Sequence, residues 1–451
     1  MSKDLKITKG VNIPLKGKAE QLIGNADRAK VFAIKPTDFH SFFPKLSVRE
    51  GDEVKAGDPI IFSKDDNRIK MTAPVSGEVI EIKRGDKRKM LEVKILADAE
   101  TKYREFPKGD LSTLDREALI QRLIESGTWP FIRQRPYGTI ASPDDTPKSI
   151  FISAVNTAPL GADQDFVVHG EEALFQAGID ALAKLTPGKV HLTVTGMSTP
   201  SKVFTEAKNV ELHRVSGPHP AGNVGVHIHH FDPILKNGDL VWYINPQDVI
   251  IIGRLLLEGR FEPTRIIALA GPEVKNPRYY RGILGMQVST ILADQLNSDN
   301  VRVVSGDVLT GTHISEDGFL GYYDQQITVL REGNEPEFFG WLKPGGNKFS
   351  ISRSLFTWLR PQRDLALDTN MHGEERAFVV TGEYERVFPF DIFPVQLLKS
   401  IMIEDIENME KLGIYELVEE DMALCEFVCT SKIPVQETLR KGLDLAKQEL
   451  G

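Results

Sequence analysis

Cysteine is nearly absent from this sequence. The chain has 451 residues and two cysteines, Cys425 and Cys429, both close to its C-terminal end. Two cysteines cannot build a disulfide framework, and so low a count is typical of a protein that works in a reducing compartment. The sequence therefore excludes the small, disulfide-stabilised class of secreted domains.

Long hydrophobic runs are also missing. The most apolar stretch, residues 249–257, contains Gly253 and Arg254 and is far shorter than the roughly 20 residues that cross a bilayer. The first ten residues are charged and have no apolar segment, so we expect no signal peptide. We predict no transmembrane span in this chain, and any membrane association must come through partner proteins.

Positive charge is in deficit overall. The chain has 64 acidic and 55 basic residues and a net charge of −9, which disfavours binding to nucleic acid or to an anionic membrane surface. Residues 83–89 (KRGDKRK) are an exception, with five positive charges in seven positions. Such a run is most often a solvated hairpin tip, and the alternative is a docking patch for an acidic partner or for lipid head groups.

The residue pattern predicts an α/β protein with several domains; by length alone we expect roughly three. Residues 1–100 contain short alternating segments separated by turn signals, which indicates a small β-domain. In residues 101–260, a helical segment near 115–125 is followed by a strand at 149–155, a helix at 170–185 and a strand at 190–194. The last three predict a parallel βαβ unit.

The second half has two further parts. Residues 261–330 suggest a β-grasp module, with strands at 264–270 and 301–304, a hairpin-like stretch to Tyr280 and a helix at 285–296. Residues 331–451 are mixed at first and then helical. Their last 60 or so residues carry apolar stripes, and Pro434 opens the final helix.

Six segments, in order along the chain, resemble one known family. They are 6–10 (KITKG), 73–79 (APVSGEV), 219–222 (HPAG) with 227–229 (HIH), 267–274 (IALAGPEV), 382–387 (GEYERV) and 425–429 (CEFVC). Together they resemble the A-subunit family of the Na⁺-translocating NADH:quinone reductase. That family is similar in architecture to the flavin- and cluster-bearing subunit of respiratory complex I.

The resemblance implies four parts: a lipoyl-like β-sandwich, a Rossmann-like α/β domain, a β-grasp (SLBB-like) ligand-binding domain and a helical C-terminal domain. It also implies a complex that passes electrons from NADH to ubiquinone and exports Na⁺. This chain would be a peripheral subunit on the cytoplasmic face of the bacterial inner membrane. It would be attached through membrane-embedded partner subunits, with ubiquinone as its associated ligand and no tightly bound redox cofactor.

The lipoyl-like part lacks the feature that a carrier domain needs. A biotinyl or lipoyl carrier exposes a modifiable lysine at a hairpin tip, whereas the tip here reads Asp65-Asp66-Asn67, and Lys70 lies on the outgoing strand. Asp and Asn are good turn residues but cannot form the amide bond to a prosthetic group. The sequence therefore favours a structural sandwich, with a carrier as the alternative.

The α/β part lacks a recognisable phosphate loop. A Rossmann turn needs glycines so that the backbone can approach a pyrophosphate. The segment that we take as its counterpart, residues 130–139 (PFIRQRPYGT), has one glycine, two prolines and several bulky side chains. We predict that a stable FMN or NADH site is lost. An NADH- or FMN-binding dehydrogenase subunit is the alternative.

Aromatic and guanidinium side chains fill that segment instead. Phe131, Arg133, Arg135 and Tyr137 lie within seven residues, next to Trp129. A second cluster, Phe39 to Phe43, includes His40 and Phe43. Flat rings beside hydrogen-bond donors suit a quinone, so we predict that these six residues contact it: Phe131, Arg133, Arg135, Tyr137, His40 and Phe43. Core and interdomain packing is the alternative.

No metal site is predicted. If residues 226–231 are extended, His227 and His229 share a face near His213 and His219, but no HExxH or paired CxxC motif is present, so packing roles are favoured.

Cys425 and Cys429 share a face if they lie on a helix, and two thiols cannot hold a cubane cluster. They are most simply the remnant of a cluster site, with an intersubunit metal site as the alternative. No activated nucleophile is evident, so we expect the isolated chain to lack catalytic activity.

Overall fold

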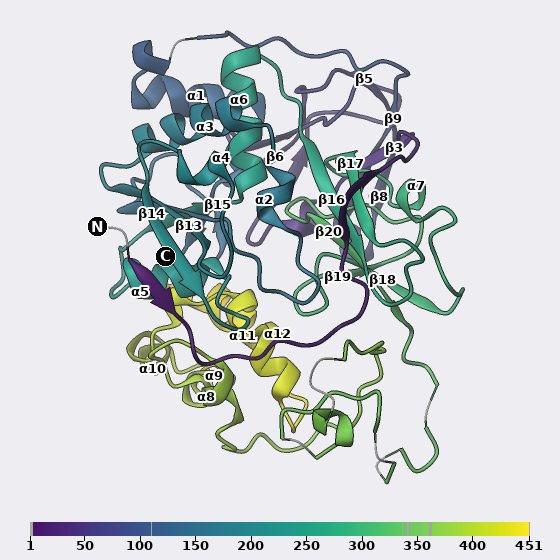
Figure 1. Cartoon of the computed structure of the whole chain (residues 1–451). Helices are drawn as coiled ribbons and strands as arrows, with labels where there is room; N and C mark the ends of the chain where they lie inside the picture. Colours follow the sequence, from purple (N-terminus) through teal and green to yellow (C-terminus); the bar gives the residue numbers. More distant parts are fainter. Residues whose placement is uncertain are drawn as a thin grey trace.

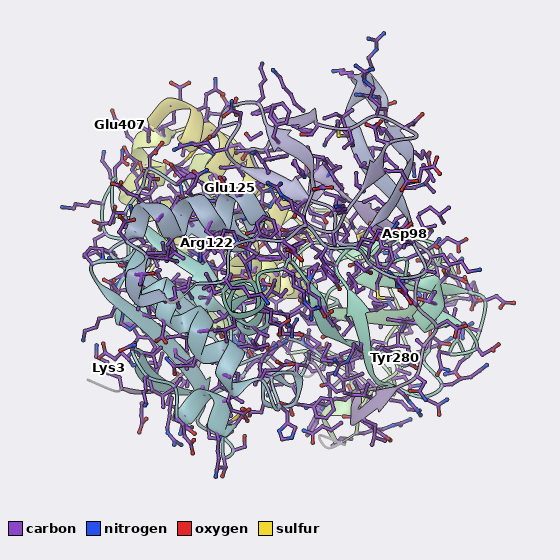
Figure 2. All side chains as sticks on the ribbon, turned by 90° about the horizontal axis from the view of Figure 1, so that it is seen from above. Lys3, Asp98, Arg122, Glu125, Tyr280 and Glu407 are labelled. Atoms are coloured by element: carbon purple, nitrogen blue, oxygen red, sulfur yellow. The ribbon has the colours of Figure 1, made fainter. Side chains whose placement is uncertain are left out.

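The computed structural model describes residues 3–109, 111–335, 337–340, 342–343, 345–352, 354–359 and 363–450. The helices of the α/β unit lie on one side of the molecule and the β-rich parts on the other, with the C-terminal helices beneath the α/β unit (Figure 1). From above, Glu125 lies on the helical side, whereas Asp98 and Tyr280 lie on the β-rich side (Figure 2). No helix among the described residues is both long and apolar enough to span a bilayer.

The α/β unit has a seven-stranded sheet in the order β1-β14-β13-β12-β15-β10-β11. Its strands are β1 (Asp4–Lys6), β10 (Arg133–Arg135), β11 (Thr139–Ile140), β12 (Ser149–Ser153), β13 (Lys189–Thr195), β14 (Glu211–Ser216) and β15 (Val241–Ile244). From β1 to β15 the neighbouring strands are parallel, and the strand order reverses between β12 and β15, as in Rossmann-type units. The short hairpin β10–β11 runs antiparallel at the other edge.

Helices cover this sheet. They are α1 (Arg116–Ser126), α2 (Gln164–Val167), α3 (Glu172–Leu185), α4 (Lys202–Thr205), α5 (Val224–Phe231) and α6 (Pro246–Glu258). Two glycines let α3 and α6 approach closely. A Cβ on Gly178 would lie 2.2 Å from the Val249 carbonyl oxygen, and one on Gly253 would lie 1.8 Å from that of Leu174. The predicted helix near 115–125 and the predicted strand–helix–strand pattern from 149 to 194 are both confirmed.

The N-terminal sandwich consists of two small sheets, β3-β9-β8-β5 and β4-β6-β7. Their strands are β3 (Val31–Ile34), β4 (Pro44–Leu46), β5 (Glu53–Val54), β6 (Pro59–Ser63), β7 (Lys70–Thr72), β8 (Gly77–Arg84) and β9 (Met90–Ala97). Ile60, Ile61, Met71 and Val79 are fully buried between them. Burial of alternate apolar side chains holds the two sheets together.

The third part is a six-stranded sheet in the order β19-β18-β20-β16-β17-β2. Its strands are β2 (Glu20–Gly24), β16 (Thr264–Ala270), β17 (Arg278–Ile283), β18 (Val301–Ser305), β19 (Thr312–Ile314) and β20 (Gln326–Arg331). The segment before β3 therefore contributes strands to the other two sheets, because β1 pairs with β14 and β2 pairs with β17.

The helix predicted at 285–296 is wrong in extent. The helix found there, α7, covers only Ser289–Leu292. Met286 and Gln287 instead form backbone bridges to Phe32 and Phe319, and Asp294 has a φ of 57°, which a right-handed helix cannot include. Long-range backbone pairing therefore limits the helix to the middle of the predicted segment.

The C-terminal part is helical, as predicted. Its helices are α8 (Glu383–Val387), α9 (Pro394–Met402), α10 (Ile406–Lys411), α11 (Glu419–Val428) and α12 (Val435–Leu450). The predicted stripes are buried at Leu397, Leu398, Met409, Leu439 and Leu443. Short 3-10 turns occur at Pro36–Asp38, Asp86–Arg88, Leu111–Thr113, Trp129–Phe131, Phe356–Leu359 and Ile414–Glu416.

Candidate functional site

The two predicted aromatic clusters are parts of one cluster. Phe39, which follows the 3-10 turn at 36–38, has its ring 4.7 Å from that of Tyr322 and 5.7 Å from that of Tyr323. The Phe131 ring stacks on Tyr322 at 5.3 Å. Tyr322 and Tyr323 thus join the sandwich to the hairpin region of the α/β unit. We call Phe39, Phe131, Arg133, Tyr243, Tyr322 and Tyr323 the junction cluster.

Sequence reasoning missed the three tyrosines of this cluster. Tyr322 and Tyr323 lie in the loop before β20, and Tyr243 lies in β15. Each is therefore more than 80 residues along the chain from both predicted segments. The only local signal is the Tyr-Tyr pair after Gly321. Such a pair does not by itself indicate which distant aromatic residues it meets.

Arg133 occupies the centre of the junction cluster. Its guanidinium carbon lies 4.5 Å from the ring centre of Tyr243 and 4.3 Å from that of Tyr323, so the cation is held between two π faces. Its Nε is buried without a hydrogen-bond partner among the described residues. Burial works to lower the pKa of Arg133, but the neighbouring Tyr243, Tyr323 and Glu420 raise it above its ordinary value. The side chain therefore remains a charged donor with unused bonding capacity.

Arg135 is engaged in the protein's own ion pairs. Its side chain is fully buried, with Nη1 2.5 Å from Asp421 Oδ2 and 2.6 Å from the Glu416 carbonyl oxygen, and Nη2 2.9 Å from Glu420 Oε1. These contacts fasten β10 to the first turn of α11. Carboxylates in that turn are also favoured by the helix dipole.

Tyr137 lies in the turn between β10 and β11 and faces the C-terminal helices. Its carbonyl oxygen accepts two hydrogen bonds from the Arg440 guanidinium, at 2.8 and 3.0 Å, and its ring meets Tyr415 edge-on at 6.2 Å. Phe131 is fully buried and stacks on Phe261 and Tyr322. Contacts within the protein thus already engage Phe131, Arg135 and Tyr137.

His40 and Phe43 are both exposed to solvent. The His40 side chain is 45% exposed, with Nε2 3.3 Å from Glu419, and Phe43 is 59% exposed. Burial lowers the pKa of His40, Glu419 opposes this, and the charges of Arg440 and Arg133 lower it further. The segment that contains His40 and Phe43 meets the 131–137 segment through Phe39, whose ring contacts Tyr322 and Tyr323.

The counterpart of a phosphate loop is not at residues 130–139. That segment is a 3-10 turn followed by the β10–β11 hairpin at the sheet edge. In a Rossmann unit the nucleotide turn follows the first parallel strand, because the next helix directs its backbone N–H groups there. That turn is residues 154–163 (AVNTAPLGAD), between β12 and α2, and it has one glycine, Gly161, and not the three-glycine pattern. The location was wrong, whereas the shortage of glycine holds at the new position.

The hairpin with the tip at residues 65–67 packs against the α/β unit. Arg68, in its tip, pairs with Asp66 at 2.7 Å and with Asp144 at 2.5 Å. Lys70 lies on the outgoing strand β7, as predicted. The tip therefore contributes a contact between domains. The basic run 83–89 covers the last two residues of β8 and the turn between β8 and β9.

The condition under which His227 and His229 would share a face is not met, since residues 226–231 belong to helix α5 and are not extended. His227 and His229 therefore do not share a face. His227 Nε2 bonds the Ala221 carbonyl oxygen at 2.8 Å, and His229 Nδ1 pairs with Glu416. Cys425 and Cys429 are free and buried, and α11 ends at Val428, so Cys429 caps it.

Comparison with known proteins decides the family. Models of the NqrA N-terminal barrel-sandwich hybrid domain, the NqrA second alpha/beta domain and the NQRA C-terminal domain (SLBB) match residues 5–98, 114–261 and 266–316. The A-subunit of the Na⁺-translocating NADH-quinone reductase of Vibrio alginolyticus is 38% identical over 446 residues, 98% of this chain and 99% of that protein. Its counterpart from Pasteurella multocida is 39% identical over 447 residues, with the same shares.

The chain belongs to the NqrA family, the A-subunits of the Na⁺-translocating NADH-quinone reductase. The resemblance seen in the six sequence segments is thereby confirmed, as are the barrel-sandwich, α/β and SLBB parts. A solved NAD⁺-reducing [NiFe]-hydrogenase is 12% identical, with a TM-score of 0.38 over 77% of this chain and 67% of that one. Members of the NqrA family are parts of an oxidoreductase complex that translocates sodium, as their names state.

Proposed function

We propose that this chain is a peripheral, quinone-associated scaffolding subunit of a Na⁺-translocating NADH:ubiquinone reductase, on the cytoplasmic face of the bacterial inner membrane. Relatives of that name align with 98% of the chain. The chain supplies a rigid surface to the complex and holds no tightly bound redox cofactor. The complex couples NADH oxidation and ubiquinone reduction to Na⁺ export.

Quinone contact at the junction cluster rests on Arg133. A quinone ring stacks on aromatic faces, and its carbonyl oxygens accept hydrogen bonds. Arg133 offers a charged donor whose Nε is buried and unpartnered among the described residues, between two tyrosines. An unsatisfied buried donor costs about 1–3 kcal/mol, so a carbonyl oxygen that bonds there would recover part of that cost.

The other predicted residues have different roles in this proposal. His40 provides a second donor and Phe43 an exposed ring at the entrance. Phe131, Arg135 and Tyr137 would support Arg133, since the Phe131 ring, the Arg135 Nη atoms and the Tyr137 carbonyl oxygen already contact other parts of the protein. The quinone head group would thus lie between the exposed edge of the sandwich and Arg133.

Attachment through partners is supported by exposed apolar side chains in the C-terminal third. Phe338, Leu342, Phe356 and Leu359 are between 60% and 83% exposed, and Phe393 and Ile403 are 65% and 73% exposed. A contiguous exposed apolar patch marks an interaction site, and these side chains all come from one stretch of the chain, residues 338–403. We assign them to contacts with the membrane-embedded subunits of the complex.

A binding experiment tests the quinone proposal. The full chain is titrated with a soluble short-chain ubiquinone while tryptophan emission is followed, because Trp129 and Trp242 are buried near the cluster. We expect Arg133→Gln to weaken binding by about tenfold or more, which corresponds to about 1.4 kcal/mol. Arg214→Gln, which changes an exposed side chain of β14 in the same domain, is the control. Equal binding by wild type and Arg133→Gln would refute the site.

The dehydrogenase alternative draws support from the reversal of strand order between β12 and β15, which is where Rossmann units bind nucleotides. A visible spectrum of the purified chain separates the two functions. A flavin band at about 450 nm in stoichiometric amount would favour the dehydrogenase. A carrier would instead add the mass of a prosthetic group to Lys70, which intact-mass measurement detects.

A further inference from the structure

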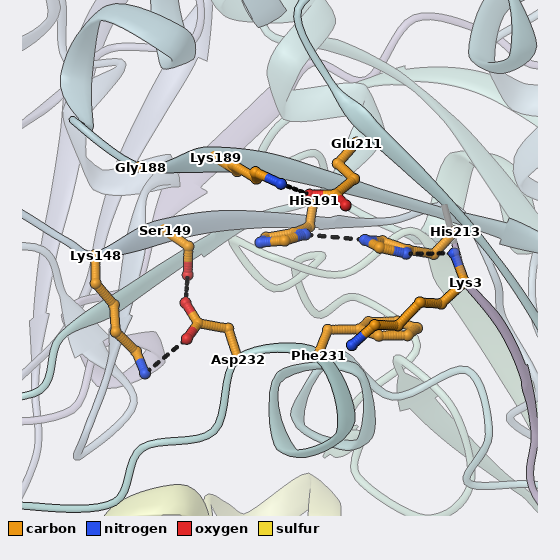
Figure 3. A pocket seen from close by; sticks show the side chains of 10 residues that line it. All are labelled: Lys3, Lys148, Ser149, Gly188, Lys189, His191, Glu211, His213, Phe231 and Asp232. Atoms are coloured by element: carbon orange, nitrogen blue, oxygen red, sulfur yellow. Dashed lines mark hydrogen bonds and ion pairs between the residues drawn. The ribbon is translucent and has the colours of Figure 1, made fainter. Parts of the chain in front are cut away.

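A cavity of about 380 Å³ opens at the amino-terminal edge of the parallel sheet. It lies between the first residues of β12, β13 and β14 and the end of α5, and Figure 3 shows the ten residues that line it. Rossmann units bind nucleotides at the opposite, carboxyl edge, so this cavity is separate from that position and from the junction cluster.

Three possible metal ligands share one face of the sheet at this cavity. His191 of β13 is in register with Glu211 of β14, and His213 is two residues further along β14, so all three side chains point the same way. One ligand atom from each lies within 4.8 Å of the other two. His191 Nδ1 and His213 Nε2 are 2.9 Å apart (Figure 3).

Packing fixes both imidazole rings. Phe151 stacks on His191 at 4.5 Å with an interplanar angle of 22°, and Phe231 stacks on His213 at 4.0 Å and 15°. Both rings are therefore already held in place at the cavity before a metal ion arrives.

We propose that His191, Glu211 and His213 form a site for a divalent transition-metal ion of the Zn²⁺ class, with water from the cavity in the fourth position. Two imidazoles, a carboxylate and a water are a ligand set that Zn²⁺ accepts in tetrahedral geometry. The hard oxygen ligands that Mg²⁺ and Ca²⁺ require are too few here.

The positive side chains around the cavity do not block a cation. Lys189 pairs with Glu211 at 2.6 Å, but its own side chain is 62% exposed, so it can turn to solvent at little cost. Lys148 is paired with Asp232 at 2.9 Å, and Asp232 also accepts a hydrogen bond from Ser149. Metal binding to Glu211 therefore displaces Lys189, whereas the pair of Lys148 with Asp232 remains.

Metal binding requires a tautomer change in His213. The Lys3 backbone N–H donates to His213 Nδ1 at 3.3 Å, which places the ring proton on Nε2, directed at His191 Nδ1. When Nε2 binds the metal, that proton moves to Nδ1, and the long bond from Lys3 is lost. The site therefore couples metal binding to the start of strand β1, and no proton is released from the ring.

The test uses the full chain, freed of metal with a chelator, and Co²⁺ as a spectroscopic probe in competition with Zn²⁺. We expect one equivalent to bind, with the intense visible absorption of tetrahedral Co²⁺. His191→Gln and His213→Gln should weaken binding at least about 100-fold, and Glu211→Gln about 10-fold. His169→Gln, an exposed histidine of the same domain, should bind like wild type.

Two results would overturn the site. One is the absence of stoichiometric binding by the wild type, and the other is equal binding by wild type and Glu211→Gln. Because Glu211 is at the cavity rim and less buried than either histidine, its variant decides the matter if the histidine variants do not fold. Thermal unfolding of the metal-free proteins establishes which variants fold, and a Zn²⁺-dependent rise in Tm of the wild type that Glu211→Gln reduces supports the site.

Discussion

Arg135 and Asp421, 286 positions apart in the chain, form an ion pair in which both side chains are fully buried. The pair joins strand β10 of the α/β unit to helix α11 of the C-terminal part. Val418 N–H also donates to Asp421, at 2.9 Å. The helical domain is thereby fixed against the sheet edge at the place where Glu419 and Glu420 reach His40 and Arg135.

Removal of one partner from this pair should be strongly destabilising. Asp421→Asn leaves the Arg135 charge buried with weaker compensation, and we expect a loss of about 3–5 kcal/mol in the free energy of unfolding. Urea unfolding measures it. The matched control is Asp144→Asn, which removes an exposed partner of Arg68 and should cost at most about 1 kcal/mol. A loss for Asp421→Asn no larger than that of the control would contradict the structural role.

Gly225 should not tolerate a methyl group, although it lies in helix α5. Alanine normally stabilises a helix interior by about 1 kcal/mol relative to glycine. Here the new Cβ would be 2.2 Å from Asp421 Oδ1 and 2.5 Å from Arg135 Nη1, so the ion pair would have to move. We expect Gly225→Ala to lower the midpoint of urea unfolding. A stabilised variant would show that α5 does not pack on the pair as described.

Buried histidines should make the protein less stable in acid. Burial lowers the pKa of His227 to about 4, against 6.5 in an exposed histidine. Between these values the unfolded chain binds the extra proton, so the free energy of unfolding falls as the pH drops from 6.5 towards 4. From pH 7.5 to 5 we expect about 2 kcal/mol to be lost through this group.

His227→Gln, which keeps a donor for the Ala221 carbonyl, should reduce that pH dependence. His169→Gln changes an exposed side chain and should leave it unaltered. Urea unfolding of the three proteins at both pH values gives the comparison. An identical slope for wild type and His227→Gln would mean that other groups account for the acid sensitivity.

Exposed apolar side chains of the C-terminal third should matter for assembly and not for folding. Phe338→Ser combined with Leu359→Ser should leave the free energy of unfolding of the isolated chain within about 0.5 kcal/mol of wild type, because both side chains are solvated. In cells that make the whole complex, we expect less of this variant in the membrane fraction. Met197→Ser, a similarly exposed change on the α/β unit, is the control. Full membrane recovery of the double variant would remove this surface from the interface.

Several features were predictable from the sequence because they depend on neighbouring residues. The strand at 264–270 was predicted with its observed bounds, and the helix after Pro434 was found with its apolar stripe inward. The lysine missing from the tip at 65–67 and the missing three-glycine pattern of a nucleotide turn are direct properties of the chain. Periodicity and turn chemistry depend on neighbouring residues, so packing between distant segments does not change such predictions.

Tertiary structure alone decided the rest. Residues 226–231 (VHIHHF) suit a strand as well as a helix, and packing of α5 over the sheet made them helical. Tyr322 and Tyr323 joined two aromatic clusters, and strand register brought His191 to Glu211 and His213, through contacts between distant segments. The sequence by itself determined which local structures form. Which side chains meet depended on sheet order and domain packing, because the free energy of those contacts exists only once distant segments are brought together.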